Sequence, residues 1–191
     1  EDGGTPGFLQ AIKAALAVEL KQEMGMEKMR AREEEIVARI FKELREIPGM
    51  HILADNLSHR LGIISFYFNS IHYNLVVKLL NDRFGIQMRG GCSCAGTYGH
   101  YLLHVDKFSS KRITDKIDEG DLSAKPGWVR MSIHPTTTDD EVDYILDSLK
   151  QIQMNSKNWE RDYTYDKHLN EFRNRNDNGL VETTVNGWFK L

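Results

Sequence analysis

The pair Pro48-Gly49 separates two stretches of sequence whose apolar residues follow different periods, and this change limits the fold more than any other feature. Before it, residues 8–24 and 26–46 place apolar side chains every three or four positions, which is typical of amphipathic helices. After it, residues 61–68 (LGIISFYF) are rich in β-branched and aromatic side chains, as expected of a central strand. Proline and glycine commonly mark such boundaries. The sequence therefore predicts a mixed α+β chain that opens with two long helices.

Strand and helix patterns alternate from Pro48-Gly49 to about residue 154. The expected elements are strands at 50–55 and 61–68, a helix at 73–84, a short strand at 86–88, helices at 98–106 and 110–119, a strand at 127–133 and a helix at 142–154. Thr138 and Glu141 have the spacing of a capping box that opens this last helix. The order predicts an α+β domain with a short, mostly antiparallel sheet covered by helices on one face. Residues 155–191 are polar and are expected to form a tail with limited packing.

Composition excludes several classes of protein. The formal net charge is -3 over 191 residues, and the aromatic residues are not interleaved with a basic run, so no nucleic-acid partner is expected. No apolar run approaches the roughly 18 to 20 residues that span a bilayer, so no membrane association is expected either. Two cysteines are too few for a disulfide scaffold and favour a reducing compartment. We therefore expect a cytoplasmic protein.

The first residues, Gly3-Gly4-Thr5-Pro6, precede an alanine-rich stretch of high helix propensity. Thr5 is expected to cap this helix and Pro6 to occupy its first turn. A helix N-terminus preceded by glycines presents unpaired N–H groups and the positive end of the helix dipole, an arrangement that binds phosphate. Any capped helix start has the same pattern, so these residues alone leave both readings open.

Both cysteines lie in the turn RGGCSCAG, which spans residues 89–96. Cys92 and Cys94, with His100 and His104 on one helix face downstream, have the number and type of ligands of a zinc site, although the C-x-C spacing is tighter than the usual C-x2-C. A disulfide between them would be strained and labile. Glycines and Arg89 make the turn exposed and electropositive, which would favour a reactive thiolate. Two inert, buried thiols are the remaining alternative.

Arg130 lies in a strand of sequence WVRMS. Because side chains alternate along a strand, Arg130 should face away from Val129 and Met131. If that face borders a cleft, its guanidinium can bind a carboxylate through two parallel hydrogen bonds. An exposed arginine on a surface strand is the alternative.

Four segments in this order, GGTPG with its helix, RLGIISFYF, GIQMRGGCSCAG and WVRMSIHPTTTDDEVDYILDSL, resemble the C-terminal part of the cysteine desulfurase and class V aminotransferase family. These enzymes use pyridoxal 5'-phosphate (PLP) and have the fold of aspartate aminotransferase, known as fold type I. The resemblance covers residues 1–154. It implies that residues 1–25 are the last helix of the large cofactor-binding domain and that residues 26–154 are the small C-terminal domain, with 155–191 a polar tail outside it.

The resemblance also implies roles for single residues. Gly4 and Thr5 match the Gly-Thr that contacts the cofactor phosphate of the neighbouring subunit, so a homodimer is expected. Cys94 matches the desulfurase nucleophile, which attacks the substrate sulfur and carries it as a persulfide. Arg130 matches the arginine that binds the α-carboxylate of an amino-acid substrate. Arg89 is assigned only to positioning the cysteine turn.

Two departures from the family pattern shape the functional hypothesis. Cys92 and Ser93 stand where desulfurases often carry histidines, which leaves aminotransferase and lyase activities as alternatives. The family's Schiff-base lysine usually follows a histidine, and no His-Lys pair occurs in the 191 residues. We therefore expect a fragment that is inactive alone and does not hold PLP covalently, with no residue assigned to a metal. The competing hypotheses are a zinc-stabilised, non-catalytic interaction domain using Cys92, Cys94, His100 and His104, and an α+β binding module with inert thiols.

Overall fold

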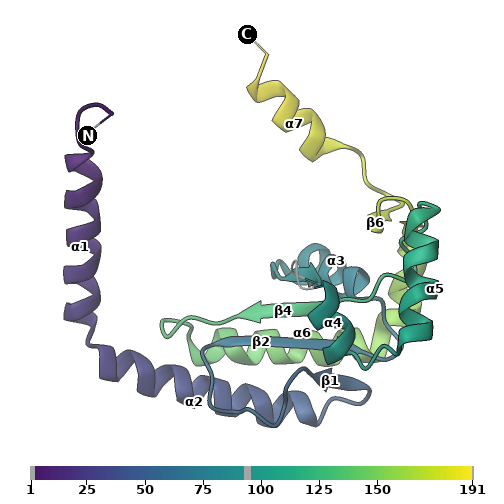
Figure 1. Cartoon of the computed structure of the whole chain (residues 1–191), viewed down its shortest axis with the longest axis horizontal. Helices are drawn as coiled ribbons and strands as arrows, with labels where there is room; N and C mark the ends of the chain where they lie inside the picture. The colour runs from purple at the N-terminus through teal and green to yellow at the C-terminus, as the bar shows by residue number, and fades with distance from the viewer. Residues whose placement is uncertain (1–2, 93–95, 191) are drawn as a thin grey trace.

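The computed structural model describes residues 3–92 and 96–190, and a four-stranded sheet lies at its centre (Figure 1). The strands are β1 (Met50–Ile52), β2 (Ile63–Phe68), β3 (Arg89–Gly91) and β4 (Trp128–Ser132). They lie in the order β1-β2-β4-β3, and each neighbouring pair is antiparallel. The expected α+β class with a short antiparallel sheet is confirmed.

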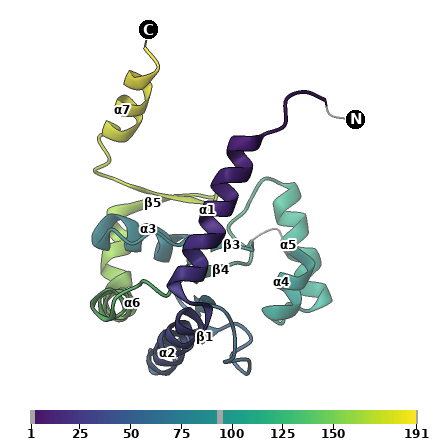
Figure 2. The ribbon, with the colours of Figure 1, turned by 90° about the vertical axis from the view of Figure 1, so that its left-hand side faces the viewer.

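Three helices pack against one face of the sheet and enclose the hydrophobic core. They are α2 (Met26–Arg45), α3 (Tyr73–Phe84) and α6 (Asp139–Trp159), and Figure 2 shows them together on one side of the strands. Phe66 and Val129 of the sheet are fully buried beneath them. The shorter helices α4 (Gly96–Leu102) and α5 (Lys107–Asp118) lie on the opposite side (Figure 2). The sheet thus has a core face and a second, more open face on which a site can form.

The strand expected at residues 86–88 begins three residues later, at Arg89. Gly85, at φ +67°, caps α3, and the backbone N–H of Ile86 donates to the carbonyl of Leu80 at 3.0 Å. Such a left-handed cap satisfies carbonyls that the helix end leaves free. Residues 86–88 therefore close α3 and connect it to the sheet, and pairing with β4 starts only beyond them.

The first helix, α1 (Phe8–Met24), has no buried residue and extends away from the sheet (Figure 1). Its start differs from the sequence prediction, because Gly7 is the N-cap and Thr5 and Pro6 precede the helix. Glycine inside a helix costs about 1 kcal/mol relative to alanine, which favours a start after Gly7. Within residues 3–92 and 96–190, no helix, α1 included, is long and apolar enough to cross a membrane.

The expectation of limited packing after residue 155 is wrong for residues 163–174. Strands β5 (Tyr163–Asp166) and β6 (Glu171–Asn174) form an antiparallel hairpin. Tyr163 is 4 % exposed and belongs to the main core. The apolar content of this hairpin comes from tyrosine and phenylalanine rings within a polar sequence, which is why composition did not reveal it. The last helix, α7 (Leu180–Trp188), extends away from the body as α1 does (Figure 1).

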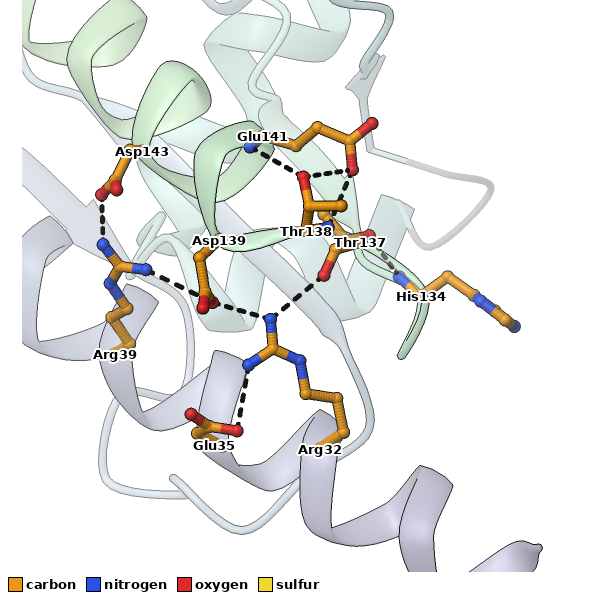
Figure 3. Close-up of polar contacts among 9 residues, drawn as sticks. All are labelled: Arg32, Glu35, Arg39, His134, Thr137, Thr138, Asp139, Glu141 and Asp143. Carbon is orange, nitrogen blue, oxygen red and sulfur yellow. Dashed lines mark hydrogen bonds and ion pairs between the residues drawn. The ribbon is translucent and has the colours of Figure 1, made fainter. Parts of the chain in front are cut away.

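The capping box predicted at Thr138 is present at the start of α6. The hydroxyl of Thr138 accepts the backbone N–H of Glu141 at 3.2 Å, and the Glu141 carboxylate accepts the backbone N–H of Thr138 at 2.8 Å (Figure 3). The first turn of α6 is also tied to α2, since Arg32 donates to Asp139 at 2.7 Å and Arg39 pairs with Asp143 (Figure 3).

Replacing Thr138 by alanine is expected to lower the free energy of unfolding by about 1 kcal/mol, because one helix N–H loses its partner. Urea denaturation followed by circular dichroism measures this loss. Thr183→Ala on the exposed helix α7 is the matched control and should unfold at the wild-type urea concentration. Equal midpoints for the two variants would show that the capping box does not stabilise α6.

Candidate active site

Two arginines lie side by side on the open face of the sheet. Arg89 of β3 is the direct cross-strand partner of Arg130 of β4, and Ser65 of β2 is the partner of Arg130 on its other side. Directly opposed residues in an antiparallel sheet point to the same face, so all three face away from the buried Val129. The predicted orientation of Arg130 is thus confirmed by the strand register. Like charges placed opposite each other repel, and an anion bound between them would offset that repulsion.

Arg130 also has an unmet hydrogen-bonding group. Its side chain is half-buried, and its Nε is buried with no hydrogen-bond partner among the residues that the structure describes. A buried donor left without a partner costs about 1–3 kcal/mol, and more when it is charged. A carboxylate bound here would satisfy it, which makes Arg130 the strongest candidate for a ligand contact.

The thiol of Cys92 lies directly after β3, so the arginine pair and the cysteine turn are adjacent. Cys92 is a free, partly buried thiol. Its Cβ lies 3.8 Å from the point that a Cβ on Gly99 of α4 would occupy. Cys94, the expected nucleophile, lies outside the described residues, so its role stays a prediction.

Tyr73 of α3 lies near this thiol and was missed by the sequence reasoning. Burial raises the pKa of the Tyr73 hydroxyl, a hydrogen bond from Asn170 lowers it, and the negative charge of a Cys92 thiolate adds a smaller increase. The Asn170 side-chain amide donates to this hydroxyl at 2.6 Å. Asn170 belongs to the C-terminal hairpin, 97 positions from Tyr73 in the sequence. No local sequence pattern predicts this hydrogen bond.

Two glycines allow the ring of Tyr73 to approach the sheet so closely. A Cβ on Gly127 would lie 2.6 Å from the Tyr73 ring, and a Cβ on Gly90 would lie 2.8 Å from Oδ1 of Asn74. Side chains at these two positions would displace α3 from the strands. A glycine just before a strand was the only sequence signal of this contact, and it is weak by itself.

Gly127→Ala is therefore expected to destabilise the chain by about 1–3 kcal/mol through overpacking against Tyr73. Thermal and urea denaturation both report the change. Gly187→Ala on α7 is the control, because no atom lies within 4 Å of its Cβ position and alanine is the better helix former. A Gly127→Ala variant as stable as the wild type would show that the ring can shift without cost.

The predicted zinc ligands do not come together among the described residues. His100 Nδ1 lies 2.9 Å from the Ser110 hydroxyl. His104 is exposed at φ +53°, beyond the end of α4 at Leu102, so the two histidines do not share a helix face as expected. The helix ends early because Asp106 caps α5 through the N–H groups of its first turn. Within residues 3–92 and 96–190, no group of three or more His, Cys, Asp or Glu side chains could hold a metal, so the zinc alternative finds no support.

Gly4 and Thr5 precede α1, whose N-terminal end lies away from the sheet (Figure 1). Both are exposed, and no side chain caps the first turn of this helix. Among the described residues other than their chain neighbours, no atom lies within 4 Å of the Cβ positions of Gly3 and Gly4. The open backbone and the uncapped N–H groups fit a phosphate, but a helix of 17 residues, about 25 Å long, keeps it away from Arg130 of the same chain.

One family of known proteins matches this sequence over most of its length. The sequence pattern of the aminotransferase class-V family matches residues 2–145. The chain belongs to the aminotransferase class-V family. Among curated members, a cysteine desulfurase of Haloferax volcanii is 30% identical over 128 residues, which are 61% of this chain and 30% of that protein. A probable cysteine desulfurase of Halobacterium salinarum is 27% identical over 154 residues, 79% of this chain and 32% of that protein.

Solved structures of the family share the fold. The apo structure of a cysteine desulfurase from Thermococcus onnurineus has a TM-score of 0.57 at 22% identity and covers 80% of this chain and 33% of that one. The cysteine desulfurase CsdA from Escherichia coli has a TM-score of 0.53 at 18% identity, and the match covers 78% of this chain and 31% of CsdA. The chain thus spans about a third of the length of these family members. The hairpin β5–β6 and α7 lie beyond the matched residues.

Proposed function

We propose that this chain is the C-terminal part of a PLP-dependent enzyme that acts on an amino acid, and that the reaction is cysteine desulfuration. The observation that carries the proposal is the buried Nε of Arg130, which has no partner among the described residues and lies beside Arg89 on the open face of the sheet. The desulfurase relatives support the choice of reaction.

Arg130 binds the α-carboxylate of the substrate in this proposal. A guanidinium offers parallel N–H groups that match the two oxygens of a carboxylate, and this geometry fixes the orientation of the amino acid as well as its charge. Arg89 adds positive potential beside Arg130 and belongs to strand β3, which leads into the cysteine turn. Its own side chain is exposed, so we assign it to positioning only.

Gly4, Thr5 and the first turn of α1 would hold the cofactor phosphate. When bound, PLP supplies the electron sink for breaking bonds at an amino acid. Because α1 separates these residues from Arg130 of the same chain, the phosphate they hold would belong to the site of a second subunit. A homodimer is therefore part of the proposal, as is a cytoplasmic location.

Cys94 is the proposed acceptor of the substrate sulfur. Its thiolate forms an S–S bond with the sulfur of cysteine while the C–S bond of the substrate breaks. The substrate carbon that was bonded to this sulfur takes up a proton, which gives alanine. Arg130 keeps the substrate carboxylate fixed while the sulfur is presented to the turn. The neighbouring Cys92, which is partly buried, is not assigned a role in this step.

The test uses this chain joined to the upstream segment that its relatives carry, supplied with PLP and L-cysteine. The masses of the peptides with Cys92 and Cys94 are then read after proteolysis. One added sulfur atom on Cys94, lost in Cys94→Ser together with sulfide release, is the expected result. Bound cofactor without added sulfur would replace desulfuration by an aminotransferase or lyase reaction of the same family. The 191 residues alone are expected to lose PLP on dialysis and to show no activity.

A further inference from the structure

A groove of about 820 Å³ runs along the outer edge of β3. Asn74 and Val77 of α3 line it on one side, and Phe172 and Arg173 of the hairpin strand β6 line it on another. Its volume lies in the upper part of the range of about 300–1,000 Å³ that ligand sites occupy. The hairpin lies beyond the residues that match the family pattern, so this groove is built partly from a segment that the family resemblance does not cover.

One wall of the groove is an unpaired strand edge. Strand β3 is last in the sheet order and pairs only with β4 among the described strands. Gly90 and Gly91 of this strand both line the groove. Among the described residues other than its chain neighbours, no atom lies within 4 Å of the Cβ position of Gly91, so another backbone can approach there. An exposed edge with free N–H and C=O groups is a template for an added strand.

The charged side chains of the groove are mostly positive. Lys78, Lys125 and Arg173 line it together with a single carboxylate, Glu171. Lys78 lies 3.4 Å from Asp82, and Arg173 lies 3.6 Å from Glu171, whereas Lys125 has no carboxylate within 4.0 Å among the described residues. Exposed pairs of this kind are weak and can be exchanged for a ligand carboxylate. The charge balance therefore favours an acidic occupant.

Apolar side chains are interleaved with these cations. Met88, Leu122 and Leu169 reach the groove from three different segments. An extended peptide points alternate side chains to opposite sides, so it can place apolar groups against these residues while its carboxylates face the cations. The three cations also come from three separate segments, a dispersed arrangement that suits a chain of several charges better than one small anion.

We propose that this groove binds an extended acidic peptide of a partner protein, which adds to the sheet as a strand beside β3. Backbone hydrogen bonds to the edge of β3 supply the register, and Lys78, Lys125 and Arg173 supply the preference for acidic residues. The groove reaches Cys92 at one end of the cysteine turn, but the proposal does not depend on the proposed desulfuration, because the site involves neither Arg130 nor the cofactor.

The test measures binding of a synthetic peptide with alternating glutamate and valine, flanked by glycines, to the 191-residue chain. Nuclear magnetic resonance of the labelled chain is expected to show saturable shifts of the Gly90 and Gly91 amides. Two variant peptides separate the contributions: one carries lysine in place of glutamate, and one is N-methylated at its central amides. Each should bind about tenfold more weakly or worse, because one loses the charge match and the other loses the backbone hydrogen bonds.

Chain variants complete the test. Lys125→Glu and Arg173→Glu are expected to weaken binding of the acidic peptide about tenfold, whereas Lys13→Glu on the remote helix α1 is the matched control and should bind as the wild type does. Absence of saturable shifts, or equal binding of the N-methylated peptide, would overturn strand addition. Equal binding of the lysine peptide would overturn the acidic preference. None of these readouts requires PLP or catalytic activity, so a failure here leaves the proposed desulfuration untouched.

Discussion

Arg130→Ala in the complete enzyme is expected to lower kcat/KM for its amino-acid substrate by about 10²- to 10³-fold, since truncating one partner of a buried charged pair costs 2–5 kcal/mol. The loss should depend on the carboxylate of the substrate. Wild-type enzyme should therefore prefer L-cysteine to cysteamine, which lacks the carboxylate, and Arg130→Ala should lose most of that preference. Steady-state kinetics with both compounds measure the difference.

Folding and catalysis can be separated in this experiment. Removal of Arg130 also removes its buried Nε, which has no partner among the described residues, so the melting temperature of the variant is not expected to fall. Arg112→Ala on the exposed surface of α5 is the matched control and should retain both kinetics and stability. If Arg130→Ala discriminated between cysteine and cysteamine as the wild type does, the carboxylate would be bound elsewhere.

Asn170→Ala is expected to lower the free energy of unfolding by about 2–4 kcal/mol, because two buried side-chain hydrogen bonds are lost at one position. Asn170 is 7 % exposed. Its side chain donates to the Tyr73 hydroxyl at 2.6 Å and accepts from the Tyr165 hydroxyl at 2.8 Å. Its carbonyl accepts from the Asn74 side chain at 2.6 Å. Asn170 is thus one of the buried links between the hairpin and α3, beside the Tyr163 hydroxyl that donates to Asp82 at 3.1 Å.

A second variant separates the amide from the backbone. Asn170 has φ +57°, a conformation that alanine adopts poorly and glycine adopts readily. Asn170→Gly should therefore be more stable than Asn170→Ala but less stable than the wild type, and the remaining deficit measures the lost hydrogen bonds. Urea denaturation gives all three values, with Asn176→Ala on the exposed segment after β6 as control. Wild-type stability in Asn170→Gly would show that the amide network does not hold the hairpin.

The Asn170 variants are also expected to change the environment of Cys92 in the cysteine turn. Tyr73 connects Asn170 to the neighbourhood of Cys92, so detachment of the hairpin should change the environment of that thiol. Faster alkylation of Cys92 in Asn170→Ala than in Asn176→Ala is the expected result. This link between the C-terminal hairpin and the turn was not foreseeable from the polar composition of residues 155–191.

Local features were read correctly from the sequence. The helix Tyr73–Phe84 has the expected bounds, the capping box at Thr138 is present, and Arg130 faces away from Val129. Each of these depends on side chains within about four positions of one another, or on the strict alternation of a strand, so neighbouring residues suffice to determine them.

The main omissions concern contacts across long sequence separations, whereas the displaced starts of α1 and β3 are local errors. Only the tertiary structure places Arg89 opposite Arg130 and buries Asn170 against Tyr73. Strand register and buried polar networks depend on which segments meet after folding. A contact between residues 97 positions apart produces no periodic pattern in the sequence. The sequence by itself determined most elements before residue 155 and the chemical character of this chain, whereas packing decided the C-terminal hairpin and which groups share a site.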